Sequence, residues 1–119
     1  VGIVRTEKEM KVALDALQEL RALSEKVTVP GNREYNSGWH TAMDLSNLLV
    51  VSEAIALAAL ERKESRGAHF REDYPGKEEA FATFNHVVRK GPDSSMQILR
   101  EPLPSVREDL RQIIQRESQ

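Results

Sequence analysis

A run in the middle of the chain, residues 60–75, gathers three arginines and a histidine around a glycine. They are Arg62, Arg66, His69 and Arg71. Arginine guanidinium groups bind carboxylates through two parallel N–H···O bonds, so the run could grip a dicarboxylate. If the preceding helix continued through the run, the first three side chains would share one face, because they are four and three residues apart.

Composition favours a plainer interpretation of the same run. Basic side chains at the end of a helix are stabilised by its dipole, and they pair with nearby acids. The acids available here are Glu61, Glu64, Glu72 and Asp73. Charge runs of this kind are common at helix ends and contribute little individually, so composition alone favours a structural role over a ligand site.

Other candidates for chemistry are weaker. His40 and Asp44 are one helical turn apart and could pair to orient a base, but no motif places a nucleophile beside them, so capping or packing is favoured. His86 stands alone in a predicted strand. The histidine spacing fits no metal motif, and the sequence contains neither Gly-x-Gly-x-x-Gly nor a Walker sequence. We predict no catalytic, cofactor-binding or metal-binding residue in this chain.

The totals exclude several classes of protein. A length of 119 residues predicts one domain, and a net charge of −2 gives no general attraction to nucleic acid or anionic membrane. The absence of cysteine excludes disulfides and thiolate ligation. There is no signal-peptide pattern and no run of roughly 18 uninterrupted apolar residues, so we expect no direct membrane insertion. The chain begins at Val1 instead of methionine, so we expect it to be part of a longer protein.

The hydrophobic pattern predicts two long helices. The first spans about 7–26, with Thr6 and Glu9 forming a capping box. The second spans about 39–65 after a cap at Asn36 or Ser37, and we expect Gly67 to end it in a left-handed conformation. This helix is apolar almost all round, so the first helix cannot cover it alone. We expect residues 39–60 to be covered by residues 105–117 or by a second copy of the chain, which would make a homodimer of this fragment.

The last third of the chain predicts smaller elements. A turn at 91–95 separates strands at about 82–89 and 96–100, which indicates a β-hairpin over about 82–100. A short terminal helix follows at about 105–117. The fold class is therefore mainly α: a helical bundle with a small C-terminal β-hairpin and a short terminal helix.

The residues of the central run also carry a family resemblance. The string Glu64-Ser65-Arg66-Gly67-Ala68-His69, followed by Arg71, Asp73, Tyr74 and Pro75, resembles the C-terminal helical domain of the flavoprotein subunit of succinate dehydrogenase and fumarate reductase. The opening 1–5 and the long helix resemble the same domain, the latter through Asn36, Gly38, Trp39, His40, Ala42, Asp44, Leu45, Asn47, Leu48 and Glu53. The stretch 103–119 is the least matched, and nothing is carried over to it.

The resemblance implies a fold and a parent enzyme. The fold would be a spectrin-repeat-like, up-and-down bundle whose first helix is truncated, with 1–119 as the single C-terminal domain of a larger flavoprotein. The parent would be an FAD-dependent oxidoreductase of electron transport and the tricarboxylic acid cycle that interconverts succinate and fumarate. This fragment would bind no FAD and would be inactive alone, because the family's flavin and substrate residues precede it.

The resemblance also implies partners and an interface. The domain would brace the FAD-binding and capping domains of the same subunit and contribute to contacts with the iron–sulfur subunit. The interface residues would be Arg62, Glu64, Arg66, His69, Arg71, Asp73 and Tyr74. The protein would be cytoplasmic and held at the inner face of the membrane through partner subunits. Two alternatives stay open: a stand-alone helical interaction module, and the same domain of a related flavoenzyme such as L-aspartate oxidase.

Overall fold

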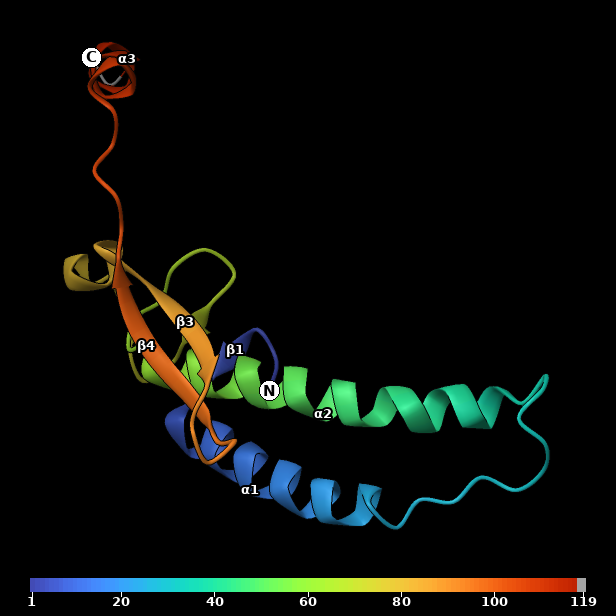
Figure 1. The fold of residues 1–119 in the computed structure, drawn as a ribbon. Helices are drawn as coiled ribbons and strands as arrows, with labels where there is room; N and C mark the ends of the chain where they lie inside the picture. The colour runs from blue at the N-terminus through green and yellow to red at the C-terminus, as the bar shows by residue number, and fades with distance from the viewer. Residues whose placement is uncertain (118–119) are drawn as a thin grey trace.

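Two long helices packed side by side form the body of the molecule. The computed structural model describes residues 1–117, in which α1 (Glu7–Ser24) and α2 (Ser37–Glu61) run antiparallel (Figure 1). A hairpin of β3 (Phe84–Lys90) and β4 (Met96–Pro102) lies across the C-terminal half of α2. The last helix, α3 (Glu108–Glu117), stands apart at the end of an extended linker. The predicted mainly α fold with a C-terminal hairpin is confirmed.

Short strands complete the fold. β1 (Val4–Arg5) pairs in parallel with β2 (Phe70–Arg71), so the N-terminus lies beside the loop that follows α2. A single 3-10 turn, η1 (Glu79–Ala82), leads into the hairpin. The hairpin is antiparallel and in register over its whole length, from Phe84 opposite Pro102 to Lys90 opposite Met96.

The predicted caps begin both long helices. The amide N–H of Glu9 donates to Thr6 Oγ1 (3.3 Å), and the Thr6 hydroxyl donates to Glu9 Oε2 (2.9 Å). The amide N–H of Trp39 donates to Asn36 Oδ1 (3.3 Å). Each cap satisfies a backbone donor that the helix itself leaves unpaired.

The ends of the elements differ from the prediction. The second helix ends at Glu61, four residues before the predicted end at 65, because Arg62 turns to extended backbone with φ −81° and ψ 96°. Gly67 does adopt a left-handed conformation, with φ 58°, but in the turn between Arg66 and His69, beyond the helix end. The terminal helix begins at 108, three residues after the predicted 105.

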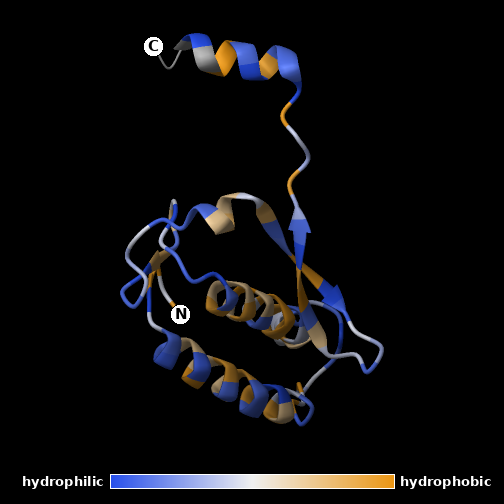
Figure 2. Cartoon of the chain, turned by 90° about the vertical axis from the view of Figure 1, so that its left-hand side faces the viewer, coloured by the Kyte–Doolittle hydropathy of each residue, from blue (hydrophilic) through white to orange (hydrophobic). Residues whose placement is uncertain are grey.

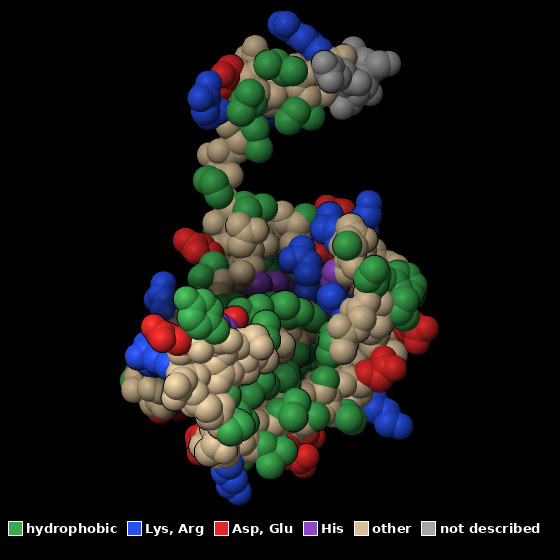
Figure 3. Space-filling view, turned by 90° about the vertical axis from the view of Figure 1, so that its right-hand side faces the viewer, with side chains coloured by type: hydrophobic (Ala, Val, Ile, Leu, Met, Phe, Trp, Pro, Cys, Tyr) green, Lys and Arg blue, Asp and Glu red, His purple; other side chains and the backbone are tan. Residues whose placement is uncertain are grey.

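The core is thin for two helices of this length. The fully buried apolar side chains of the described residues are Met10, Leu49, Ala56 and Ala59. The open part of α2 exposes apolar side chains on more than one side, including Met43, Leu48, Val51 and Ile55. Figure 2 shows that the residues along α2 are mostly apolar, and Figure 3 shows apolar side chains lining a hollow on the face turned to the viewer. By length and composition alone α2 could cross a membrane, a test that the core helices of soluble proteins also pass.

The expectation that residues 105–117 cover α2 is wrong. β4 leads the chain away from α2, and the linker 103–107 holds α3 clear of the two long helices (Figures 1 and 2). Pro104 fixes one φ angle of that linker and cannot donate a backbone hydrogen bond. The hairpin covers part of α2 in place of α3.

One arginine fastens the hairpin to the end of α2. Arg100 of β4 pairs with Glu61 Oε1 (2.6 Å). Its guanidinium carbon also lies 4.9 Å from the ring centroid of Phe84 and 5.5 Å from that of Phe81. The ion pair therefore fastens β4 to the end of α2, and the cation–π contacts join Arg100 to β3 and η1.

Replacing Arg100 by alanine should lower the free energy of unfolding by about 1–2 kcal/mol, because an exposed cation–π contact and an exposed ion pair each contribute up to about 1 kcal/mol. Urea unfolding followed by circular dichroism measures the change. Arg89→Ala, on the same hairpin but with no ion pair or ring contact among the described residues, is the matched control. Equal effects of the two substitutions would contradict the assigned role of Arg100.

Candidate interdomain interface

Glu64 is a fully buried carboxylate at the centre of the cluster that follows α2. Arg62 Nη2 pairs with its Oε1 at 2.8 Å, Arg66 Nε donates to both oxygens at 3.0 and 3.1 Å, and the amide N–H of Glu78 donates to Oε2 at 3.0 Å. Burial raises the pKa of Glu64, but the donors from Arg66, Glu78 and Arg62 outweigh it and lower the pKa to about 2. The group is therefore ionised at neutral pH, with its hydrogen bonds made inside the chain.

Arg71 is the second fully buried charged residue. Its Nε and Nη2 donate to Asp73 Oδ1 and Oδ2, both at 2.7 Å, as a bidentate fork. Its Nη1 donates to three backbone oxygens at the end of α2, at 3.1–3.2 Å; these belong to Ala59, Leu60 and Arg62. Arg71 thus satisfies carbonyls that the helix end leaves unpaired, and its charge suits the negative end of the helix dipole.

Asp73 connects this arrangement to the first helix. Its Oδ2 also accepts from the amide N–H of Glu7 (2.9 Å), in the first turn of α1. The fork from Arg71 holds the pKa of the Asp73 carboxyl well below its usual range. The Tyr74 ring stacks against the same guanidinium, with 4.9 Å between the Arg71 carbon and the ring centroid. One pair of residues therefore ties the end of α2 to the beginning of α1.

His69 is held as a neutral ring. Arg5 Nη1 lies 2.6 Å from Nδ1 of His69, and Nε2 lies 3.1 Å from the backbone oxygen of Arg62. A guanidinium cannot accept, so Nδ1 is the acceptor and Nε2 carries the proton that it donates. Burial and the neighbouring charges of Arg5, Arg71 and Arg62 lower the pKa of His69, against the opposing effect of the bond to the Arg62 backbone.

The structure brings the sequence-predicted residues together but not as a helix face. The side chains of Arg62, Arg66 and His69 converge through the loop after Glu61, because α2 has already ended. All seven predicted residues belong to one hydrogen-bonded cluster: Arg62, Glu64, Arg66, His69, Arg71, Asp73 and Tyr74. The Arg71 fork lies on Asp73, and Arg62 and Arg66 bind Glu64, so internal acids occupy positions that a dicarboxylate would take.

Sequence reasoning missed three members of the cluster. Arg5 reaches His69 across 64 residues of sequence through the β1–β2 pair, which is too short to predict. The Ser65 hydroxyl contacts the backbone oxygens of Arg71 and Tyr74 (3.2 and 2.9 Å) and accepts from the Arg71 amide (2.8 Å). Glu78 contributes only its backbone, which side-chain patterns cannot reveal.

The two remaining histidines lie outside the cluster. His40 packs edge-on against the neighbouring Trp39, with 5.2 Å between ring centroids. His86 packs against Phe84 and Phe81, with centroids 5.3 and 6.0 Å away. Burial lowers the pKa of His86, and its buried Nε2 has no hydrogen-bond partner among residues 1–117. The His86 ring therefore packs among aromatic rings, whereas His40 is exposed.

Replacing Arg71 by methionine should remove about 3–5 kcal/mol of stability, because the substitution leaves a carboxylate and three carbonyls without their donor. Arg71→Lys should lie between wild type and methionine, since an ammonium keeps the charge but loses the fork. Urea unfolding measures all three proteins, with Arg89→Met as the control. A loss below about 1 kcal/mol in Arg71→Met would contradict the capping role.

The protein should lose stability at acid pH, over the pH range in which the folded and unfolded forms of Glu64 differ in protonation. Its pKa is lowered from 4.5 to about 2, so its contribution is complete above pH 4.5 and is lost as the pH falls toward 2. In that window the unfolded chain binds more protons, so stability falls with falling pH. Unfolding free energies should show a smaller pH dependence in Glu64→Gln than in wild type, and an unchanged one in the exposed Glu34→Gln control. Parallel curves for wild type and Glu64→Gln would contradict the assignment.

The chain is similar to flavoprotein subunits of known name. It is 39% identical over 80 residues to a succinate dehydrogenase flavoprotein subunit of Coxiella burnetii, covering 66% of this chain and 14% of that protein. It is 36% identical over 81 residues to the 8-methylmenaquinol:fumarate reductase flavoprotein subunit of Wolinella succinogenes, covering 67% and 13%. An L-aspartate oxidase of Acinetobacter baylyi is 39% identical over 82 residues, covering 66% and 14%. The chain thus spans only 13–14% of the length of these relatives.

Solved structures contain the same fold. Sdh1 of Mycobacterium smegmatis, in complex with UQ1, superposes with a TM-score of 0.87 at 41% identity, over 95% of this chain and 20% of that chain. FrdA of E. coli quinol fumarate reductase superposes with a TM-score of 0.76 at 26% identity, over 89% and 20%.

The match extends over nearly the whole chain. The family described as fumarate reductase flavoprotein C-term matches residues 1–113, which include both long helices, the cluster and the hairpin. The chain therefore belongs to the family of C-terminal domains of fumarate reductase and succinate dehydrogenase flavoproteins.

Proposed function

We propose that this chain is the C-terminal domain of a flavoprotein subunit that interconverts succinate and fumarate, and that it braces the flavin-binding part of that subunit. The family match supports the domain, and the names of the Coxiella and Wolinella relatives support the reaction. The reaction is hydride transfer between succinate and FAD. An L-aspartate oxidase is the second candidate, supported by the Acinetobacter relative at 39% identity.

The observation that supports the bracing role is that charged groups are buried while large apolar groups are exposed. The charged cluster is satisfied within the chain, with Glu64 and Arg71 fully buried, whereas α2 leaves large apolar side chains open to solvent. Apolar surface of this extent marks a contact with another protein surface. The flavin-binding part of the subunit would cover α2, and the cluster would keep the ends of α1 and α2 in fixed positions beneath it.

Within the cluster we assign two roles. Glu64, Arg71 and Asp73 position the loop after α2. Arg62, Arg66, His69 and Tyr74 are partly exposed and would meet the neighbouring domains directly. Contacts with the iron–sulfur subunit, and through it a place at the cytoplasmic face of the membrane, belong to the same proposal.

FAD itself would be bound by the part of the subunit outside this chain. Dinucleotide sites of the βαβ type need two parallel strands joined by a helix, with a glycine-rich turn at the phosphate. Within residues 1–117 the parallel pair is β1 and β2, each two residues long, and neither is followed by such a turn. The residues present do not fit the cofactor, so we derive no flavin step from them.

The test is to produce this chain together with the separate flavin-binding part of its parent. We expect the two to co-purify and to oxidise succinate with an artificial acceptor dye, with L-aspartate as the competing substrate. Arg66→Ala and His69→Ala should each weaken association roughly 5- to 30-fold, as expected for residues at a protein interface.

Two controls separate docking from folding. Arg111→Ala, on the distant α3, should leave association unchanged. Urea unfolding of each variant chain alone shows whether the loss of association exceeds any loss of stability. A well-folded chain that never associates with the flavin-binding part would refute the bracing role. Oxidation of L-aspartate but not succinate would show that the parent is an L-aspartate oxidase instead.

A further inference from the structure

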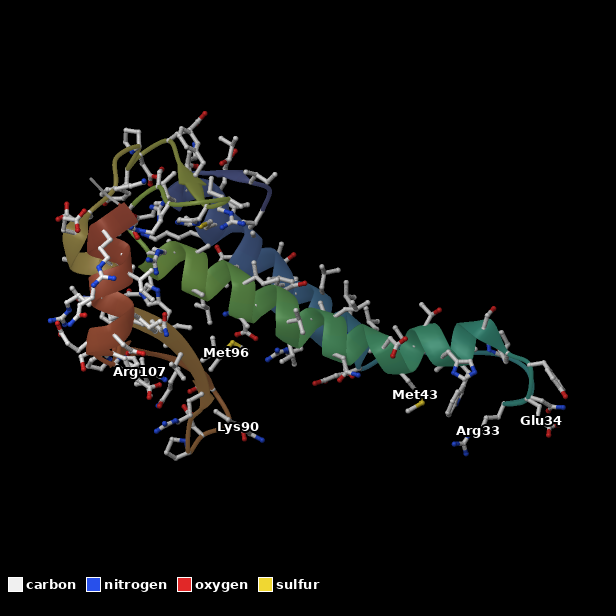
Figure 4. The ribbon with its side chains drawn as sticks, turned by 90° about the horizontal axis from the view of Figure 1, so that it is seen from above. Arg33, Glu34, Met43, Lys90, Met96 and Arg107 are labelled. Carbon is white, nitrogen blue, oxygen red and sulfur yellow. The ribbon has the colours of Figure 1, made fainter. Side chains whose placement is uncertain are left out.

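The pairing of β1 with β2 depends on one bond between side chains. The pair is two residues long, and its backbone bonds include those from the amide of Phe70 to the Ile3 oxygen (3.3 Å) and from the amide of Glu72 to the Arg5 oxygen (3.0 Å). It lies at the end of the molecule opposite the connection between α1 and α2 (Figure 4). Two strands as short as these are not stable by themselves, so the bond from Arg5 Nη1 to His69 Nδ1 (2.6 Å) supplies much of what holds β1 in place.

The bond between Arg5 and His69 requires a neutral imidazole. A guanidinium keeps its protons and cannot accept a hydrogen bond, so Nδ1 of His69 must carry no proton. Nε2 already carries the ring proton and donates it to the Arg62 backbone oxygen (3.1 Å). A second proton could therefore bind only at Nδ1, where it would replace the hydrogen bond to Arg5 with repulsion between two cations.

The groups that face His69 from the neighbouring elements would not stabilise a charged ring. Burial lowers the pKa of His69, and the charges of Arg5 on β1, Arg71 on β2 and Arg62 directly after α2 lower it further. On β3, burial lowers the pKa of His86, and His69 lies near enough to lower that pKa too. Within residues 1–117 no carboxylate is hydrogen-bonded to the His69 ring, so a proton taken up there would meet cations.

The acids of the cluster keep their charge over the pH range in which histidine titrates, about pH 5–8. Glu64 has a pKa of about 2, and the fork from Arg71 holds the pKa of Asp73 well below its usual range. The bond from the Glu7 amide to Asp73 and the bonds from Arg71 to the end of α2 therefore persist when His69 is protonated. The loss is confined to the hold on β1.

We propose that Arg5 and His69 form a pH-sensitive latch, which holds β1 on β2 while His69 is neutral and releases β1 when His69 takes up a proton. Because the pKa of His69 in the folded chain lies below its ordinary value of 6.5, the contribution of the latch is complete above pH 6.5 and is lost as the pH falls below that value. The latch goes beyond the bracing role. One consequence rests on the proposed function: the flavin-binding part would precede β1, so release would loosen the connection between the two parts while α1 and α2 stay packed.

The test is hydrogen exchange of the full-length subunit, purified with the chains that accompany it and followed at single amides by mass spectrometry. Between about pH 7.5 and about pH 5.5, the protection of the Phe70 and Glu72 amides, corrected for the intrinsic pH dependence of exchange, should fall at least about fivefold, because a hydrogen bond to a charged group is lost. The Ser65 amide, which donates to the Gly76 oxygen (2.9 Å) in the same loop, is the matched control and should change less than about twofold. No fall at Phe70 and Glu72, or an equal fall at Ser65, would overturn the proposal.

Two variants identify the histidine that responds. In His69→Asn the side-chain oxygen takes the place of Nδ1, accepts from Arg5 and does not titrate, so the protection of the two amides should be the same at both pH values. His86→Asn removes the other histidine with a lowered pKa and should keep the wild-type response. A response that persists in His69→Asn, or that disappears in His86→Asn, overturns the latch.

Arg5→Met provides a second test that does not depend on the folding of His69→Asn. Without the guanidinium donor, the Phe70 and Glu72 amides should be poorly protected at both pH values, and a wild-type response in this variant overturns the proposal. Hydrogen exchange needs no turnover, so a subunit that shows the response but fails to oxidise succinate would count against the proposed reaction alone.

Discussion

The fold depends on where the guanidinium of Arg71 lies. A helix leaves its last carbonyls without partners, and at the end of α2 three backbone oxygens meet a single buried nitrogen, Nη1 of Arg71. The rest of the same guanidinium binds Asp73, which in turn accepts from the first turn of α1. Burying an arginine that had fewer hydrogen-bond acceptors would cost a large desolvation free energy. The acceptors around Arg71 must therefore all be in place together. This set of bonds fixes the end of α2 against the beginning of α1, in addition to the packing of the two helices and the ion pair between Arg21 and Glu53.

The same set of bonds determines what the cluster can do. The arginines of the central run suggest a site that binds a dicarboxylate substrate. A guanidinium whose two-nitrogen fork already binds an internal carboxylate cannot bind a second carboxylate in the same way. Glu64 keeps its charge because its donors outweigh the effect of burial, and His69 stays neutral because Arg5 can only donate to it. The cluster is therefore a rigid polar joint, and a rigid joint supports a neighbouring domain better than it binds a small molecule that must come and go.

Sequence reasoning succeeded where the determinants are local. Thr6 and Asn36 cap the helices because each side chain acts on an amide within three residues, and the hairpin follows from its turn at 91–95. It failed where the determinant is remote. The end of α2 is bound by Arg71, ten residues beyond Glu61, and Arg5 enters the cluster through a two-residue strand. The sequence predicts the terminal helix at about 105–117, but its pattern does not say what lies against that helix.

The two ends of α2 differ in how far their polar groups are satisfied by hydrogen bonds within the chain. At the C-terminal end, arginines, acids and backbone carbonyls satisfy one another, so a partner there gains little from new charged bonds and must bind mainly through shape and apolar contact. At the N-terminal end, Arg33 keeps an open edge and Tyr35 projects into solvent, while the Asn36 side chain holds the loop through bonds to the backbone oxygens of Pro30 and Asn32. New hydrogen bonds at that end would not have to replace existing ones. The C-terminal end, whose polar groups are already satisfied, is therefore suited to being fixed within its own subunit through shape and apolar contact.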